Sequence, residues 1–296
     1  MRRIRALAVV LLLVAFGARA EEAPPQGAPP QGAPPEDAPT YIGTELCVGC
    51  HEDAGETFTT SPHGAPLSDE ARPEAARGCE ACHGPGSAHF EAGGDGHILA
   101  FAKAETAAAR SQPCRSCHAG EAGLHDVLGS EHALAGVACS DCHRVHQRES
   151  EHLLHQPTPA LCYGCHADVR ARFALPERHA VNRREAVCQD CHSPHGTKHG
   201  FALLAAHDRT CVGCHQDLAG PFIFEHTPLV TEGCVTCHEP HGSVNRHLLR
   251  RQEVAQLCYQ CHTVTPASHV QPSFRDCTRC HVAMHGSNTD PRFLER

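Results

Sequence analysis

Ten copies of the pattern C-x-x-C-H run through this sequence, and they constrain the fold more than any other feature. Together they use all 20 cysteines of the 296-residue chain, so no cysteine is left over. A histidine directly follows the second cysteine in every copy. The full five-residue pattern, and not a bare cysteine pair, is therefore what has to be explained.

C-x-x-C-H is the pattern of covalent c-type haem attachment. Two thiols on one turn of backbone add to the two vinyl groups of one porphyrin edge, and the adjacent imidazole becomes the proximal iron ligand. The pattern predicts ten haems c. The attachment cysteines are Cys47, Cys50, Cys79, Cys82, Cys114, Cys117, Cys139, Cys142, Cys162, Cys165, Cys188, Cys191, Cys211, Cys214, Cys234, Cys237, Cys258, Cys261, Cys277 and Cys280. The motif histidines are His51, His83, His118, His143, His166, His192, His215, His238, His262 and His281.

Zinc sites and disulfides are the two alternative uses of paired cysteines. Paired C-x-x-C units build tetrahedral zinc sites, and exported cysteines often form disulfides. Neither chemistry requires a histidine immediately after the second cysteine. The tenfold histidine therefore favours haem over both.

The composition agrees with an interior that side chains alone do not fill. Tryptophan is absent, and there are only 3 tyrosines and 10 phenylalanines.

Without its first twenty residues the chain carries 21 basic residues against 34 acidic ones. Phosphate contacts need a basic surface, so nucleic-acid binding is set aside.

The N-terminal forty residues lie outside the repeats. Residues 1–20 have a basic start, an apolar run and the sequence Ala18-Arg19-Ala20, which together indicate an export signal. Residues 21–40 are Pro-rich without hydrophobic periodicity and are typical of a linker. We therefore expect an extracytoplasmic, periplasmic protein whose cytochrome domain covers residues 41–296.

The motifs alternate between two kinds, which divides the domain into five tandem two-haem units. The second motif of each pair has one histidine upstream and another just downstream, as in CQDCHSPHG. Successive units start 47 to 49 residues apart, except for a longer first unit of 67 residues. The expected units 1 to 5 span about residues 41–105, 106–155, 156–205, 206–250 and 251–296.

These extra histidines are the candidate distal ligands, and their number matches the number of irons. The upstream histidines are His63, His132, His179, His226 and His269. The downstream histidines are His89, His146, His195, His241 and His285. We expect all ten irons to be bis-histidine ligated.

Geometry restricts which haem each distal histidine serves. A downstream histidine cannot pass round the porphyrin of its own motif, so it must reach a neighbouring haem. An upstream histidine has room to serve either haem of its unit, and an exchange such as His125 for His132 stays open. Glycine follows several of these histidines, which we attribute to backbone running close to a flat cofactor.

The remaining histidines and methionines are not expected to bind iron. Met284 lies three residues after its motif histidine, so it cannot pass round the porphyrin of its own haem either. Met1 lies in the export signal. The histidines outside the pattern are expected to be ordinary surface residues, namely His97, His125, His152, His155, His199, His207 and His247.

The expected fold is a multihaem cytochrome c of short helices and irregular loops around an extended row of ten haems, with very little strand. One helix is expected from about Cys162 to Phe173, before Pro176. Six-coordinate irons transfer electrons without binding substrate, so we expect an electron-transfer protein and not an enzyme. Two alternatives stay open: a multihaem reductase with one open haem, and a free periplasmic shuttle.

The motif set also resembles a known family. The early CHGPGSAH, the repeated CHxPHG and the closing CHVAMHGSN are similar to the periplasmic decahaem cytochromes of the MtrA/DmsE/PioA type, over residues 41–296. The resemblance implies insertion in an outer-membrane porin-like β-barrel. It also implies exchange of electrons with an inner-membrane or periplasmic cytochrome on one side. On the other side it implies an extracellular multihaem cytochrome or a terminal reductase.

Overall fold

The computed structural model describes most of the chain after residue 36, and short helices make up its regular structure. The described residues are 37–101, 106–146, 150–206, 208–263, 269 and 276–295. The predicted export signal and nearly all of the predicted linker lie outside them. Residues Pro39–Arg296 form one compact part. Its α-helices are α1 (Thr44–Val48), α2 (Glu52–Thr60), α3 (Gly64–Leu67), α4 (Glu80–His83), α5 (Ser87–Glu91), α6 (Ala107–His118), α7 (Glu131–Leu134), α8 (Cys139–Cys142), α9 (Ala160–Tyr163), α10 (Ala167–Arg172), α11 (Arg209–Val212), α12 (Thr227–Thr231) and α13 (Val254–Cys258).

Irregular loops and single 3-10 turns connect these helices. In the described ranges no β-strand forms, and strand-like pairing is limited to isolated bridges. This confirms the expected multihaem-cytochrome fold class of short helices and loops. The 3-10 turns span Glu74–Ala76, Val127–Gly129, Glu151–Leu153, Val181–Arg183, Cys188–Asp190, Gly200–Ala202, Gln216–Leu218, Cys234–Thr236, Arg246–Leu248 and Cys277–Arg279.

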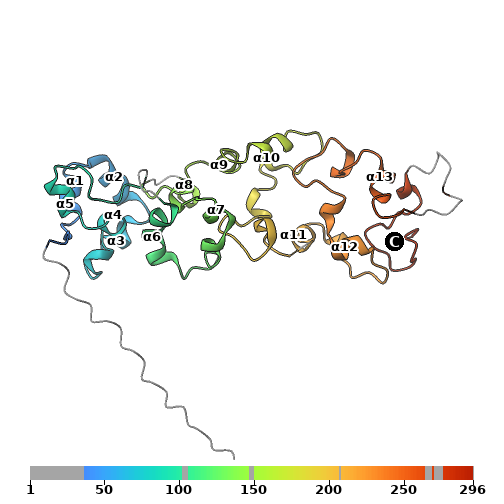
Figure 1. The fold of residues 1–296 in the computed structure, drawn as a ribbon, viewed down its shortest axis with the longest axis horizontal. Coiled ribbons are helices and arrows are strands. Elements are labelled where there is room, and N and C mark those ends of the chain that lie inside the picture. The colour runs from blue at the N-terminus through green and yellow to red at the C-terminus, as the bar shows by residue number, and fades with distance from the viewer. Residues whose placement is uncertain are drawn as a thin grey trace, which may run out of the picture. The chain divides into compact units, whose positions relative to one another are not determined.

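The helices follow the order of the predicted units in space as well as in the chain (Figure 1). The groups α1–α5, α6–α8, α9–α10, α11–α12 and α13 succeed one another. The expected single helix from Cys162 to Phe173 is instead two helices, α9 and α10. The break falls between Gly164 and His166, where the motif histidine leaves the helical region with φ −96° and ψ 59°.

Each motif forms one turn of helix, which is what haem attachment requires. In motif after motif the backbone N–H of the histidine donates to the carbonyl of the first cysteine, for example His51 to Cys47 at 2.9 Å and His281 to Cys277 at 2.9 Å. At Cys114 the same turn is the end of α6. Side chains three and four residues apart share one face of such a turn. Both thiols and the imidazole therefore project to the same side.

A loop that we call the strap folds back over the second motif in units 2, 3 and 4. The straps are residues 151–155, 200–204 and 246–250, and each makes an isolated bridge with its motif histidine, as His192 does with Leu203. Two successive residues of each strap have positive φ, for instance Phe201 (59°) and Ala202 (50°). Non-glycine residues adopt this region rarely. The surrounding contacts must therefore hold the straps in this conformation.

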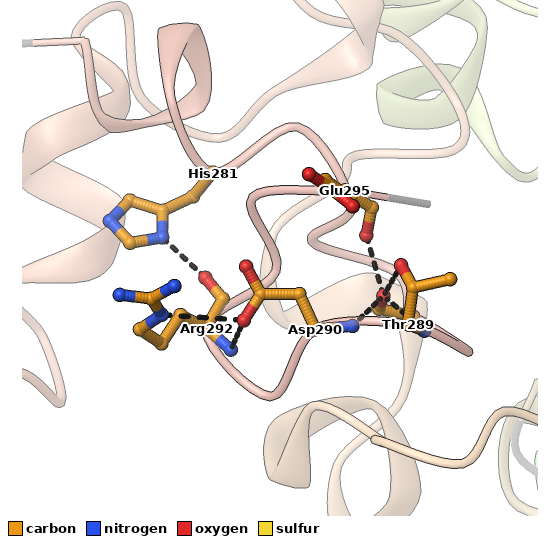
Figure 2. Close-up of polar contacts among 6 residues, drawn as sticks. His281, Thr289, Asp290, Arg292 and Glu295 are labelled. Carbon is orange, nitrogen blue, oxygen red and sulfur yellow. Dashed lines mark hydrogen bonds and ion pairs between the residues drawn. The ribbon is translucent and has the colours of Figure 1, made fainter.

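A buried or half-buried hydroxyl side chain closes each loop that follows a downstream histidine in units 3 to 5. The Thr197 hydroxyl donates to the Leu203 carbonyl at 2.8 Å, and the Ser243 hydroxyl donates to the Leu249 carbonyl at 2.6 Å. In unit 5 the hydroxyl of fully buried Ser287 donates to the Glu295 carbonyl at 2.5 Å and accepts from the Asp290 N–H at 3.0 Å. Figure 2 shows this C-terminal loop around Thr289, Asp290 and Arg292.

Paired backbone hydrogen bonds join unit 3 to unit 4 and unit 4 to unit 5. Glu177 of unit 3 and Ser243 of unit 4 exchange both N–H···O bonds, at 3.1 and 2.8 Å. Phe224 of unit 4 and Ser287 of unit 5 do the same, at 2.9 and 3.0 Å. In both cases one residue lies two positions before an upstream histidine and the other two positions after a downstream one. The bridges therefore bring these two classes of histidine to the same junction.

The buried apolar core of the described residues is small. It comprises Phe58, Leu67, Ala138, Phe173, Val181, Ala255 and Ala283. Its two aromatic side chains pack against candidate distal ligands: Phe58 lies 6.3 Å from His146 and Phe173 lies 5.4 Å from His241, between ring centroids. The side-chain interior is thus organised around the histidines.

The loop-closing hydroxyl gives a stability prediction. Ser287→Ala removes the hydroxyl and leaves a buried carbonyl and two N–H groups without their partner, which should lower the free energy of unfolding by about 1–3 kcal/mol. Thermal denaturation of the haem-loaded protein measures this loss.

The matched control is Ser150→Ala. The Ser150 hydroxyl is also buried but has no hydrogen-bond partner among the described residues, so its removal should change stability little. Equal destabilisation by both substitutions would contradict the role assigned to Ser287.

Candidate haem-ligand pairs

Each motif histidine lies opposite one of the ten predicted distal histidines. The ring centroids of the ten pairs are 6.0 to 6.4 Å apart, and no histidine occurs in two of them. The pairs are His51–His89, His63–His118, His83–His146, His132–His166, His143–His195, His179–His215, His192–His241, His226–His262, His238–His285 and His269–His281.

This separation fits one iron held between two imidazoles. Metal–imidazole nitrogen bonds are about 2 Å long, and a ring nitrogen lies about 1.1 Å from the ring centre, so two trans imidazoles have centroids about 6.3 Å apart. Direct stacking would bring the rings closer, and unrelated rings would show no common distance. The residues present therefore fit the haem iron that the motifs predict.

The pairs at the junctions cross from one unit to the next. Each upstream histidine of units 1 to 4 faces the first motif histidine of the following unit, as His132 faces His166. Each downstream histidine of units 2 to 5 faces the second motif histidine of the preceding unit, as His195 faces His143. Two opposite crossings thus connect every pair of adjacent units.

At the two ends the pairs close within a unit. His89 of unit 1 faces His51 of its own unit, with ring centroids 6.2 Å apart. His269 of unit 5 faces His281 of its own unit, at 6.4 Å. One histidine of unit 1 and one of unit 5 are thus paired within their own unit.

The placement of the upstream histidines differs from the sequence analysis. The sequence left each of them a choice between the two haems of its own unit, and only His269 is placed within its own unit. His63, for example, faces His118 in unit 2 at 6.0 Å. The physical reason is the junction, where backbone bridges lie two residues before His179 and His226. At His132 the Pro194 carbonyl of the next unit meets Nδ1 instead. The downstream histidines lie beside neighbouring motifs, as the geometric argument expected.

Hydrogen bonds at Nδ1 orient many of these rings. The motif histidine of the second motif meets a strap carbonyl in units 2 to 4, as His192 Nδ1 meets the Phe201 carbonyl at 2.9 Å. In unit 5 His281 Nδ1 meets the Arg292 carbonyl at 2.6 Å (Figure 2). A carbonyl only accepts, so Nδ1 carries the proton and Nε2 remains available as the ligand. The positive-φ straps therefore supply the acceptors that fix the tautomer.

The neighbouring unit supplies this acceptor for two upstream histidines. His132 Nδ1 lies 2.9 Å from the Pro194 carbonyl, and His179 Nδ1 lies 2.7 Å from the Pro240 carbonyl. Both prolines belong to the sequence Pro-His-Gly, whose histidine is a downstream ligand candidate of the same junction. One short segment thus provides one candidate ligand and orients another.

Burial favours the neutral imidazole, which is the form that ligates a metal. Burial lowers the pKa of His63, His195, His226 and His241 below the ordinary range, and a facing imidazole adds to the effect in each case. Burial likewise lowers the pKa of His83, beside His146. These rings are thus prepared to coordinate without first losing a proton.

The histidines outside the pattern are placed differently. His155 uses Nε2 for a hydrogen bond to the Ser140 carbonyl at 2.9 Å, so its coordinating nitrogen is engaged. His152 and His247 sit at the positive-φ position of a strap and contribute their backbone carbonyls to His143 and His238. His207 lies outside the described residues.

Two glycines after downstream histidines let the polypeptide of the preceding unit approach closely. A Cβ at Gly242 would lie 2.1 Å from the Arg172 carbonyl oxygen, and one at Gly196 would lie 2.7 Å from the Ser130 Cβ. Both glycines also have positive φ, 153° and 91°. The close neighbour is polypeptide of the preceding unit, so glycine is required by the junction.

The motif cysteines lie near one another in the order of the motifs. Within a unit the first cysteines of the two motifs lie close enough to shift each other's thiol pKa, as Cys139 raises the pKa of Cys114. Between units the second cysteine of the later motif is shifted in the same way by the next motif, as Cys117 raises the pKa of Cys82. The remaining pairs are Cys47–Cys79, Cys142–Cys162, Cys162–Cys188, Cys191–Cys211, Cys211–Cys234, Cys237–Cys261 and Cys258–Cys277. None of the 20 cysteines forms a disulfide.

Comparison with known proteins agrees with this geometry. The chain is 34% identical over 272 residues to the multiheme cytochrome MtrA of Shewanella baltica (strain OS185), which covers 83% of this chain and 79% of that protein. A family model described as a doubled CXXCH motif matches residues 132–171, 179–220 and 226–267. The chain belongs to the MtrA-like multihaem c-type cytochromes. A model of the XYPPX repeat matches residues 17–36, in two copies.

The matched segments of this multihaem cytochrome divide the chain at different points from the predicted units. Each begins at an upstream histidine and includes the first motif of the next unit. Residues 132–171 accordingly contain both His132 and the His166 that faces it. The same holds for His179 with His215 and for His226 with His262. The family's doubled motif thus encloses one of the two crossings at each of these junctions.

The described part of this cytochrome contains no helix long and apolar enough to cross a membrane.

Proposed function

We propose that this multihaem cytochrome binds ten haems c, each held by one motif histidine and one distal histidine, and conducts electrons along them. The observation that carries the proposal is the set of ten ring pairs with a common separation of 6.0 to 6.4 Å. Haem iron supplies a one-electron Fe(III)/Fe(II) couple when it is bound in this way. The ligand pairs of the preceding section are the proposed assignment.

The complete pairing favours electron transfer over catalysis. A multihaem reductase needs one iron with an open position for its substrate. Here every motif histidine faces a second imidazole, including those at both ends, His51 and His281. Two strong axial ligands leave no position for substrate. Pairing thus supports a conductor rather than an enzyme.

The cysteine contacts support a route in motif order. The porphyrin edge that carries two thioethers must lie next to its own cysteines. Cysteines of consecutive motifs lie close enough to shift one another's thiol pKa at all nine steps from Cys47 to Cys277, so those edges would lie near one another step by step. We infer that electrons pass between neighbours in the chain order of the motifs.

We further propose that the protein acts in the periplasm and inserts into an outer-membrane β-barrel. The export signal predicted in residues 1–20 and the likeness to MtrA support this location. An inner-membrane or periplasmic cytochrome would exchange electrons with one end. An extracellular multihaem cytochrome or terminal reductase would exchange them with the other. The competing proposal is a soluble shuttle with the same ten haems and no barrel.

Haem content and spin state test the ligation. The pyridine haemochrome assay should give ten haems per chain, and low-temperature electron paramagnetic resonance (EPR) of the oxidised protein should show low-spin ferric iron. Bis-imidazole ligation gives a strong ligand field at every iron, which is why no high-spin signal is expected. A stoichiometric high-spin signal in the wild-type protein would instead support the reductase.

The crossed assignment predicts where the loss of a distal ligand acts. His132→Ala should convert one haem in ten to the high-spin form, and added imidazole should restore it. Because His132 faces His166, this signal should vanish when Cys162 and Cys165 are also replaced by alanine. It should persist when Cys139 and Cys142 of its own unit are replaced.

His155→Ala is the matched control for that experiment. Its Nε2 is bonded to the Ser140 carbonyl, so all ten haems should stay low-spin. A high-spin signal from His132→Ala that disappears with the Cys139 and Cys142 replacements would refute the crossed assignment.

Fractionation tests the barrel. Affinity-tagged full-length protein should be recovered from detergent-solubilised outer membranes together with one integral β-barrel protein in constant proportion, because the conduit model requires a barrel around the cytochrome. Recovery of all the haem protein from the soluble periplasmic fraction, with no such companion, would favour the shuttle.

A further inference from the structure

One motif histidine has a hydrogen-bond partner unlike those described for the others. His118 Nδ1 lies 2.6 Å from the Glu121 Oε1 carboxylate oxygen. The contact is local, because α6 ends at His118 and the Glu121 N–H donates to the His118 carbonyl at 3.1 Å. The turn after the helix therefore positions the carboxylate beside the imidazole.

Backbone carbonyls take this role at other candidate ligands of the described structure. Examples are Leu99 for His83, at 2.7 Å, and Gly96 for His89, at 2.7 Å. A carbonyl is a neutral dipole, whereas a carboxylate is an anionic acceptor. Hydrogen bonds to ionised acceptors are roughly twice as strong as neutral ones. His118 is therefore polarised toward imidazolate more strongly than these rings.

The ring that faces His118 is unusual in the opposite way. His63 lies 6.0 Å from His118 between centroids, and its Nδ1 is buried without a hydrogen-bond partner in the described structure. One face of this site thus receives a charged acceptor, and the other face receives none.

We propose that Glu121 is a positioning residue that tunes the third haem, attached at Cys114 and Cys117, toward its ferric state. This inference rests on the proposed bis-histidine ligation. Negative charge transmitted through His118 stabilises Fe(III) relative to Fe(II), because the ferric centre has one more positive charge. The uncharged and unpartnered Nδ1 of His63 adds no comparable charge from the opposite face.

The position of this site in the row gives the tuning a consequence. The third motif follows the two motifs of unit 1 and precedes the remaining seven, and Cys82 of motif 2 interacts with Cys117 of motif 3. An iron that resists reduction at this point makes the row uneven. Electrons that pass between unit 1 and units 2 to 5 must then reduce the third haem, which is less favourable than reducing its neighbours.

Glu121→Gln is the decisive variant, because glutamine keeps an acceptor oxygen in a side chain of the same length and removes the charge. Ferric/ferrous equilibria are followed by potentiometric titration of the complete ten-haem protein with optical and EPR detection. One of the ten one-electron steps should move toward the ferrous form by about tenfold, which is about 59 mV for a one-electron couple. Since 59% of the Glu121 side chain is exposed, solvent screening sets this as the expected upper size.

Glu185→Gln is the matched control. Glu185 has a similar exposure of 65%, pairs with Arg183 and is not a recorded partner of any candidate ligand. It removes the same charge from the surface, so its titration should superimpose on that of the wild type. The EPR signal of one low-spin haem should change in Glu121→Gln and not in Glu185→Gln.

The outcomes separate this inference from the function on which it rests. Ten low-spin haems in the wild type, with identical titrations for Glu121→Gln and Glu185→Gln, would overturn the tuning role alone. A small shift spread evenly over all ten steps would also overturn it, because that is the effect of net charge. A wild-type protein without ten low-spin haems would instead overturn the bis-histidine proposal.

Discussion

The structure depends on the fact that an iron held on both faces needs two imidazoles about 6 Å apart, and a single motif supplies only one. The second ring must approach from the far side of the porphyrin, which the motif's own turn of helix cannot reach. This chain meets the requirement with segments from adjacent units, so each junction holds two imidazole pairs in opposite senses. His132–His166 and His143–His195 illustrate the two senses at one junction.

This arrangement gives a chain with few buried apolar side chains a different source of cohesion. In a conventional repeat protein, neighbouring units bury apolar faces against each other. Here the described contacts between units include backbone bridges, such as Glu177 with Ser243, and facing imidazoles. The glycine at position 242 is needed because the Arg172 carbonyl of the preceding unit leaves no room for a Cβ. Close backbone approach and ligand placement are therefore two aspects of the same junction.

The sequence predicted the components well and their connections less well. Five-residue motifs specify a local turn, so the attachment cysteines and motif histidines can be read directly, and the short-helix fold follows from them. The spacing of His63, by contrast, allows it to reach several irons, and only the three-dimensional junction places it against His118. The loop-closing Thr197, Ser243 and Ser287 were missed, although their shared place two residues after a downstream histidine is a repeat signal. Glu121 was missed because one carboxylate in one unit leaves no periodic trace.

The units differ at a few sites, and these differences do not follow from the repeat itself. Crossed ligation alone would make the interior sites equivalent, with potentials set by similar carbonyl-bonded imidazoles. The first and last sites differ from the interior ones, since His51 and His281 each face a histidine of their own unit. The third site differs from the other interior sites because the carboxylate of Glu121, which follows α6, contacts His118. With the proposed ligation and tuning, an otherwise uniform row would have distinct ends and one distinct interior step, so the two directions of electron transfer along it would differ physically.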